Sequence, residues 1–388
     1  MSSIIIVRLI PKADYGVYAY ANSLLGMFCI FEAMGMTTAL LQYGCTSEGN
    51  HKQQIRSFTF YVAVAFQFLL CLVIFLSGML FEFNIKGTGI LLSAMSFLPL
   101  FRVVRDMQNI YMRTEFKTKE FASANNFYTI VTVLFSVLLS LFLYVYGLIL
   151  ATYISVILSC LFIAYYQRYR FPTFDWSLPK GEKKELVKFA LVSAITNSSS
   201  SIVYVVDSFL LGIVVAKSDV VASYKVAMTI PTALNFIPMA VMTYVYPYFA
   251  KHSSDSQWCL KHLKKVYCFF GVANLLLSLF LIVLTPLITN IIFGSQYLDS
   301  VPIMRVLFLN YFISATFYVI SGQLLVTLKK ITFNLVVNFA VCIVNLFLNT
   351  ILISHYDGIG AALATTISTF FSAVACSAYL LYCYKKQC

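Results

Sequence analysis

The sequence predicts an all-α membrane protein, a polytopic helical bundle with about eleven transmembrane helices. Apolar residues make up 60% of its 388 residues and charged residues only 11%, which is typical of a chain surrounded mostly by lipid. Eleven apolar stretches are long enough to cross a bilayer, at about 1.5 Å per helical residue. The basic residues between these stretches lie mostly on one side, which orients the chain.

The predicted spans follow one another with short connections. They are 16–41, 57–80, 88–110, 121–144, 147–166, 189–215, 221–248, 266–293, 301–328, 331–353 and 358–384. A glycine-bearing turn precedes the last span of each half, with Gly147 in the first half and Gly358 and Gly360 in the second. The longest connection, 167–188, is basic and predicts a linker between two halves.

Nineteen of the 27 Lys and Arg residues lie in the loops after spans 1, 3, 5, 7 and 9 and in the C-terminal tail. The opposite side has only Arg8, Lys12, Lys86 and Lys217. Because cytoplasmic loops are enriched in Lys and Arg, we expect a cytoplasmic C-terminus. These helix-end positions also explain the net charge of +12, so we expect no nucleic-acid partner.

The second half of the chain repeats the first. Leu150, Ala151, Thr152, Ile154 and Ser155 match Leu363, Ala364, Thr365, Ile367 and Ser368 at a spacing of 213 residues. Near the start of each half, Asp14, Tyr18 and Ala21 match Asp219, Tyr224 and Ala227. The common orientation predicts a parallel repeat of two bundles around a central cavity. We therefore expect an N-terminal bundle at 1–167, a basic cytoplasmic linker at 168–188 and a C-terminal six-helix bundle at 189–388.

Seven ionisable residues lie inside predicted spans, where each charge costs roughly 2.5–3.5 kcal/mol on insertion scales. They are Glu32, Arg102, Arg105, Asp106, Asp207, Lys225 and Arg305. Arg102, Arg105 and Asp106 stand at i, i+3 and i+4, so one helix face carries two cations and one anion. Either Arg102 pairs with Asp106 as a structural contact, or the guanidinium groups bind a phosphate.

The other four charges suggest further roles. Lys225 and Arg305 lie close to the outer face, where they either line a substrate cavity or extend to the interface. Glu32 is the best ion-coupling candidate, because burial and a neighbouring arginine act on its protonation in opposite senses. Asp106 is a further candidate, and Asp207 either takes up H⁺ or Na⁺ or pairs with Lys225.

The sequence gives no sign of a catalytic or metal centre. The ten cysteines are scattered without CxxC spacing, and none of the four histidines lies inside a span. We therefore expect no catalytic residues, no metal and no cofactor.

Three stretches resemble a known family. They are Arg8–Tyr18 with the sequence RLIPKADYGVY, Arg113–Lys117 with the sequence RTEFK, and Val205–Leu211 with the sequence VVDSFLL followed by Tyr224. Across essentially the whole chain, the sequence resembles Wzx-type oligosaccharide flippases of the multidrug, oligosaccharidyl-lipid and polysaccharide exporter superfamily. Members of that family begin with a helix that this chain lacks, so we expect twelve spans minus the first, with Ile4–Leu9 as its outer end. The alternative is an eleven-span protein with an extracellular N-terminus.

The resemblance implies a multi-pass protein of the bacterial inner membrane. It would translocate undecaprenyl-diphosphate-linked oligosaccharide units, such as O-antigen (lipopolysaccharide) or capsule precursors, by alternating access. The implied partners are this lipid-linked substrate, the bilayer, a coupling H⁺ or Na⁺, and other polysaccharide assembly proteins.

Three rival functions remain. An ion-coupled multidrug or cation antiporter of the same superfamily would favour acidic spans, whereas here four cations face three anions. A membrane glycan polymerase would carry a large outer loop, and every outer loop here is short. A scaffold protein without transport would not need charges at mid-membrane depth.

Overall fold

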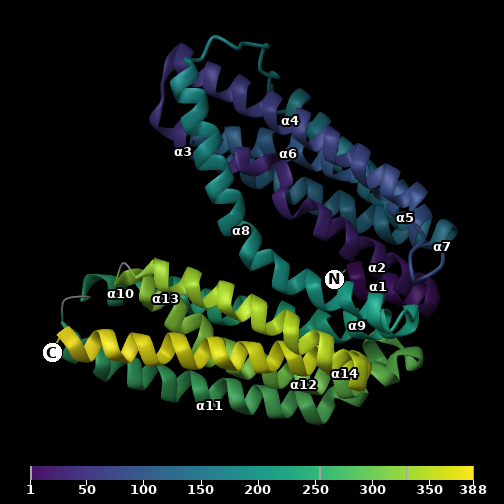
Figure 1. Ribbon diagram of the computed structural model, residues 1–388, viewed down its shortest axis with the longest axis vertical. Coiled ribbons are helices and arrows are strands. Elements are labelled where there is room, and N and C mark those ends of the chain that lie inside the picture. Colours follow the sequence, from purple (N-terminus) through teal and green to yellow (C-terminus); the bar gives the residue numbers. More distant parts are fainter. Residues whose placement is uncertain (1, 253–254, 329, 388) are drawn as a thin grey trace. The chain divides into compact units, whose positions relative to one another are not determined.

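The computed structural model describes the backbone of residues 2–252, 255–328 and 330–387, and the side chains over these ranges apart from 2–4, 196–204, 331 and 387. Every regular element in these ranges is helical (Figure 1), which confirms the predicted all-α class. Residue contacts group the chain into two compact units, Met1–Ile202 (unit 1) and Val203–Cys388 (unit 2). Each unit is described separately below.

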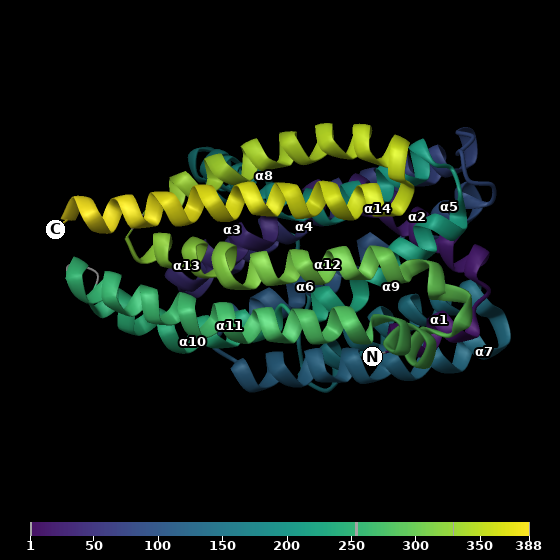
Figure 2. The same cartoon turned by 90° about the horizontal axis from the view of Figure 1, so that it is seen from below.

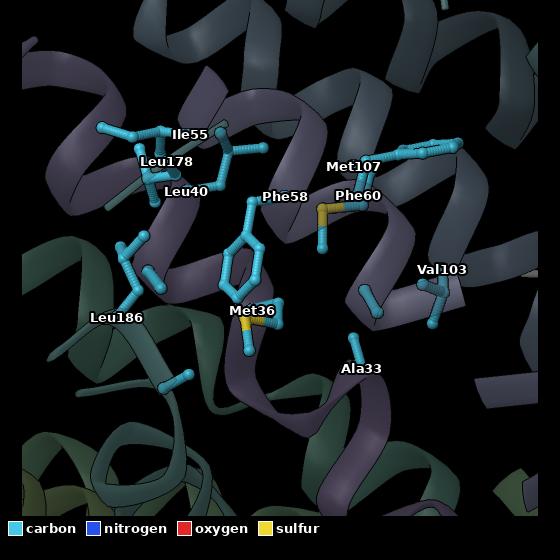
Figure 3. Close-up of a cluster of buried hydrophobic side chains, with 13 residues drawn as sticks. Ala33, Met36, Leu40, Ile55, Phe58, Phe60, Val103, Met107, Leu178 and Leu186 are labelled. Carbon is cyan, nitrogen blue, oxygen red and sulfur yellow. The ribbon is translucent and has the colours of Figure 1, made fainter. Parts of the chain in front are cut away.

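Unit 1 is built from helices connected mostly by short turns. They are α1 (Ser2–Leu9), α2 (Lys12–Phe28), α3 (Met36–Thr46), α4 (Gly49–Leu80), α5 (Thr88–Met95), α6 (Leu98–Thr114), α7 (Thr118–Tyr165) and the first part of α8 (Lys180–Val214). An irregular segment, Cys29–Gly35, separates α2 from α3. A buried apolar cluster, drawn in Figure 3, joins this segment to α3, α4, α6 and α8.

Unit 2 contains the rest of α8 and a second series of helices. They are α9 (Ser218–Ala233), α10 (Phe236–Lys251), α11 (Ser256–Ile288), η2 (Thr289–Phe293), η3 (Ser295–Ser300), α12 (Val301–Ile313), η4 (Ser314–Tyr318), α13 (Val319–Thr327) and α14 (Ile331–Gln387). Its apolar core includes Phe249, Leu324 and Leu380, from α10, α13 and α14.

Eight helical segments of the described chain are long and apolar enough to cross a membrane, so the protein is a multi-pass membrane protein. Two of them, Thr118–Tyr165 and Thr332–Lys386, each contain two of the predicted spans. A straight helix of 48 residues would extend about 72 Å, more than twice the apolar thickness of a bilayer. Each of these two segments must therefore fold back on itself.

The reversal in α7 is a tight hairpin at Tyr144, whose φ of 48° and ψ of −122° leave the helical region. Beyond it, a Cβ on Gly147 would lie only 2.2 Å from the carbonyl oxygen of Leu139. That distance requires the two arms of the hairpin to touch, and only a residue without a side chain fits there.

The hairpin in α14 repeats this geometry 213 residues later. Asp357 has a φ of 49° and a ψ of −128°, and a Cβ on Gly360 would lie 2.0 Å from the Leu352 carbonyl oxygen. Figure 2 shows α14 doubling back on itself. Because the turn residue, the glycine and its contact all recur at one spacing, the backbone agrees with the predicted parallel repeat.

The predicted linker packs against unit 1. Ser57 and Tyr61 of α4 donate hydrogen bonds to the carbonyl oxygens of Thr173 and Pro172, at 2.9 and 3.0 Å. Leu178 and Leu186 are buried in the unit 1 core. The division between units therefore falls inside α8, after Ile202, and differs from the expected boundary at 188/189.

Candidate functional site

Arg102 lies on α6, whose first turn contains Pro99. Val103 and Met107 of the same helix are buried in the unit 1 core (Figure 3). Their packing fixes how α6 is rotated about its axis. The Arg102 side chain is half-buried and interacts electrostatically with Glu32 and Asp106. In the described part of the chain it has neither an ion pair nor a hydrogen bond, so its guanidinium donors are available to a ligand.

Glu32 lies where the helix between α2 and α3 is broken. Phe31, Glu32, Ala33 and Met34 all have non-helical backbone angles. The Ala33 amide donates to Oε1 of Gln67, a fully buried residue of α4, at 3.1 Å, so a side chain replaces the lost helical hydrogen bond. Broken membrane helices of this kind expose backbone groups and recur at transporter binding sites.

The break is held in place by close packing. Gly35 has a φ of +74°, and a Cβ there would lie 2.1 Å from the carbonyl oxygen of Ala190 on α8. Ala33 and Met36 belong to the same buried cluster as Val103 and Met107 (Figure 3). The packing therefore brings Glu32 within electrostatic range of Arg102.

Arg105 and Asp106 form an ion pair, with 2.9 Å between the Arg105 guanidinium and the Asp106 carboxylate. The Arg105 guanidinium also lies 3.9 Å from the centre of the Tyr128 ring, in a cation–π contact. The alternative expectation, a pair between Arg102 and Asp106, is wrong, because Asp106 is held by its neighbour Arg105. Arg102 and Glu32 are thus the charges of this cluster that lack a direct ion pair among the described residues.

Asp207 in unit 2 is buried, with 1% of its surface exposed, and accepts three hydrogen bonds. The donors are the Tyr224 hydroxyl at 2.5 Å, the Thr365 hydroxyl at 2.5 Å and the Asn349 amide at 2.7 Å. Asn349 also donates to Asn345 at 3.0 Å. These polar side chains come from α8, α9 and the two arms of α14.

Lys225 and Arg305 have different surroundings in unit 2. Lys225, on α9, is half-buried and attracts Asp207 electrostatically without forming a direct ion pair in the described chain. Of the two alternatives for Asp207, the direct pair with Lys225 is not formed in the described chain, and three hydrogen bonds hold the carboxylate instead. Arg305 is exposed on α12 and donates to the Ile282 carbonyl oxygen at 3.3 Å.

The structure brings four of the predicted site residues together in unit 1: Glu32, Arg102, Arg105 and Asp106. Sequence reasoning missed several residues that complete these sites: Gln67, Tyr128, Tyr224, Asn345 and Asn349. A signal existed for some of them. Gln67 is an isolated amide in an apolar span, and Asn345 and Asn349 stand at i and i+4, so they share one helix face.

Arg102 and Arg305 also occupy matching places in the two halves. Each stands three residues after a proline in the first turn of its helix, Pro99 in α6 and Pro302 in α12. This Pro-x-x-Arg pattern is a further sign of the repeat that sequence reasoning missed.

Comparison with known families gives one match to a family model, which is described as polysaccharide biosynthesis protein and covers residues 5–302. A search of curated proteins finds no match.

Solved structures share the fold. An inward-facing multidrug resistance transporter of the MATE family in the MOP superfamily has a TM-score of 0.79 and 14% identity, with 100% of this chain and 93% of that chain covered. The lipid II flippase MurJ in an inward closed conformation has a TM-score of 0.78 and 18% identity, with 99% and 85% covered. A MOP superfamily transporter from Pyrococcus furiosus has a TM-score of 0.61 and 13% identity, with 100% and 91% covered.

Proposed function

Because the chain belongs to the polysaccharide biosynthesis protein family and has a MOP-superfamily transporter fold, we propose that it is a flippase for lipid-linked oligosaccharides. The proposed substrate is an undecaprenyl-diphosphate-linked unit such as an O-antigen or capsule precursor. The protein would carry this unit across the bacterial inner membrane by alternating access, with H⁺ or Na⁺ as the coupling ion. Other polysaccharide assembly proteins are the proposed partners.

The observation that carries this proposal is that Arg102 is half-buried and has no direct ion pair in the described chain. A diphosphate is strongly disfavoured in the apolar bilayer core, and a guanidinium can offset that cost by offering two parallel hydrogen bonds. Arg105 is already neutralised by Asp106, whereas Arg102 has no direct partner in the described chain. Arg102 is therefore the group best placed to bind the diphosphate, with Arg105 beside it. Within unit 2, Lys225 and Arg305 are proposed separately as residues that contact the substrate.

Glu32 supplies the proposed coupling. When Glu32 is ionised, its charge offsets that of Arg102, and when it is protonated the cluster becomes net positive. Proton uptake would then favour anion binding, and proton loss would favour release. Asp207 is a second coupling candidate, since its three donors hold a carboxylate at a buried position where a cation could also bind.

A cation antiporter is the second candidate function, favoured by the carboxylates of Glu32, Asp106 and Asp207. The two functions differ in what Arg102 does. In a flippase it binds the substrate, whereas in a cation antiporter it would repel it.

The first prediction concerns Arg102→Ala. We expect it to abolish surface glycan in a bacterium that lacks its own sugar-unit flippase, while the lipid-linked intermediate accumulates. Its thermal stability in detergent should fall less than that of Arg105→Ala, because it loses the electrostatic attraction to Glu32 and Asp106 but no direct ion pair or hydrogen bond of the described chain. Surface glycan and lipid-linked intermediate are measured in parallel.

Arg105→Ala is the matched comparison. It should lose export too, but also stability, because it leaves Asp106 without its partner. Normal export by both variants would reject the diphosphate site, and improved cation efflux by Arg102→Ala would favour the antiporter.

A further inference from the structure

A second basic site lies in unit 1, away from the Arg102 cluster. It is a pocket of about 240 Å³ where the end of α6 and both ends of α7 meet the start of α4. Its charged lining residues are Arg56, Lys117, Arg168, Arg170, Glu115 and Glu120. Glu115 is already paired with Lys52 at 2.7 Å, so the four cations outweigh the remaining carboxylate.

Arg56 is the buried element of this pocket, with 6% of its surface exposed. Its guanidinium carbon lies 3.6 Å from the centre of the Tyr111 ring and 4.5 Å from that of Tyr169. Its terminal nitrogens donate to Gln53 and to the Arg170 carbonyl oxygen. Its Nε is buried without a hydrogen-bond partner, and no carboxylate of the described chain pairs with it.

A buried guanidinium without an anion is unfavourable, because its desolvation is not offset by an opposite charge. The aromatic rings offset only part of that cost. An anionic ligand in the pocket would accept a hydrogen bond from Nε and neutralise the excess charge. Phosphate fits best, because arginine binds it through parallel hydrogen bonds.

A separate apolar groove of about 740 Å³ also lies on α4. It includes Tyr61 and Leu69 of α4 and Phe174 and Trp176 of the segment after α7. Tyr61 is five residues from Arg56, which is about 7.5 Å along the helix axis and about 140° around it, so the groove lies on another face of α4. From Tyr61 to Leu69 the groove extends for about 12 Å. The segment after α7 leads from one to the other, since Arg170 lines the pocket and Phe174 and Trp176 line the groove. A charged pocket and an apolar groove joined by one segment match the two parts of a lipid, its phosphate and its chain.

We propose that unit 1 binds an anionic phospholipid at this site. Its headgroup phosphate lies against Arg56, Arg168 and Arg170, and one acyl chain lies against α4 and Trp176. Basic pockets between membrane helices on the cytoplasmic side bind anionic headgroups, and the loops that form this pocket belong to the basic side of the chain. The site is separate from the proposed substrate site and does not depend on the flippase function.

Lipid binding is the direct test. The full chain is purified and placed in nanodiscs of phosphatidylcholine alone or of phosphatidylcholine mixed with phosphatidylglycerol. Bound phosphatidylglycerol is then counted by native mass spectrometry. Arg168→Gln/Arg170→Gln removes two exposed side chains but leaves the Arg170 carbonyl that holds Arg56. We expect at least about tenfold weaker retention of phosphatidylglycerol, because charge-assisted hydrogen bonds are lost.

Two further variants complete the design. Lys119→Gln/Lys180→Gln removes the same charge from exposed residues that do not line the pocket, and it should retain phosphatidylglycerol like the wild type. Ala65→Trp places a large ring in the apolar groove and should weaken phosphatidylglycerol binding without removing charge.

Thermal stabilisation by inorganic pyrophosphate is measured with the same variants. If Arg168→Gln/Arg170→Gln and Lys119→Gln/Lys180→Gln lose phosphatidylglycerol retention equally, the proposal is overturned and general surface charge explains the binding. Strong stabilisation by pyrophosphate, together with unchanged lipid retention in Ala65→Trp, would also overturn it and assign the pocket to a soluble phosphate compound. Export is not measured, so failure here is distinct from failure of the flippase proposal.

Discussion

At the scale of residues, the proposed ion coupling depends on the charge balance between Arg102 and Glu32. Asp106 already neutralises Arg105, so Glu32 is the carboxylate whose protonation changes the net charge of the cluster. It lies on a broken helix, a feature that recurs at transporter binding sites.

Glu32→Gln keeps the size of the side chain but removes its charge permanently. We expect transport by this variant to lose its dependence on the proton or sodium gradient, because the cluster can no longer alternate between neutral and positive. The measurement is substrate translocation in proteoliposomes with and without an imposed gradient. Full gradient dependence in the variant would exclude Glu32 as the coupling group and leave Asp106 and Asp207.

Outside the membrane, the pair between Lys52 and Glu115 links the start of α4 to the end of α6. Partial burial raises the pKa of Glu115, but the hydrogen bond and charge of Lys52 outweigh it and hold this pKa below its usual range. The ionised form is thus favoured in the folded protein. The pair contributes fully above the unfolded pKa of about 4.5 and is lost as the pH falls through the lower folded value.

Glu115→Gln should therefore lower the free energy of unfolding by about 1 kcal/mol near neutral pH and have little effect in acid. Thermal unfolding in detergent near pH 7 and near pH 3 measures the difference. Glu48→Gln, at an exposed carboxylate just before α4, is the control and should change stability little at either pH. An equal effect of Glu115→Gln at both pH values would mean that its charge does not stabilise the fold.

At the scale of elements, the broken segment Cys29–Gly35 depends on one glycine. Gly35 combines a left-handed backbone with direct contact to the α8 backbone at Ala190. An irregular backbone at membrane depth is stable only where protein surrounds it. Here Gln67 accepts a hydrogen bond from the Ala33 amide, and α8 packs against Gly35.

Gly35→Ala should cost on the order of 3 kcal/mol or more, since the new methyl group is strained and meets the Ala190 carbonyl oxygen. Gly322→Ala on α13 is the matched control, because its Cβ would meet no atom within 4 Å, and helix propensity favours alanine. Melting temperature and export are measured for both. Wild-type behaviour of Gly35→Ala would mean that α8 can move away from the break.

At the scale of the whole molecule, the chain orientation follows from its basic loops. A reporter fused after Lys386 should show a cytoplasmic location, because nineteen Lys and Arg residues lie on that side. Paired alkaline phosphatase and green fluorescent protein fusions measure it, with fusions at Lys217 as the opposite-side control. Phosphatase activity at the C-terminus would invert the assigned topology and place the phospholipid pocket outside.

The sequence by itself determined the features that depend on local chemistry. Long apolar runs can satisfy their backbone only as helices in lipid, so the all-α class and the span positions follow from composition. The residues Leu150–Ser155 and their matches Leu363–Ser368 also revealed the repeat. The structure adds the reason for the glycine before each stretch, because Gly147 and Gly360 stand at the same place in two hairpins.

Only the tertiary structure decided how the charges are partnered. The spacing of Arg102, Arg105 and Asp106 allows either arginine to pair with the carboxylate, and their rotamers and the Tyr128 ring select Arg105. Likewise, the donors to Asp207 come from α9 and from both arms of α14. A linear sequence does not show which distant helices meet, because that depends on packing between them, and so the apolar spans were predictable while the partners of their buried charges were not.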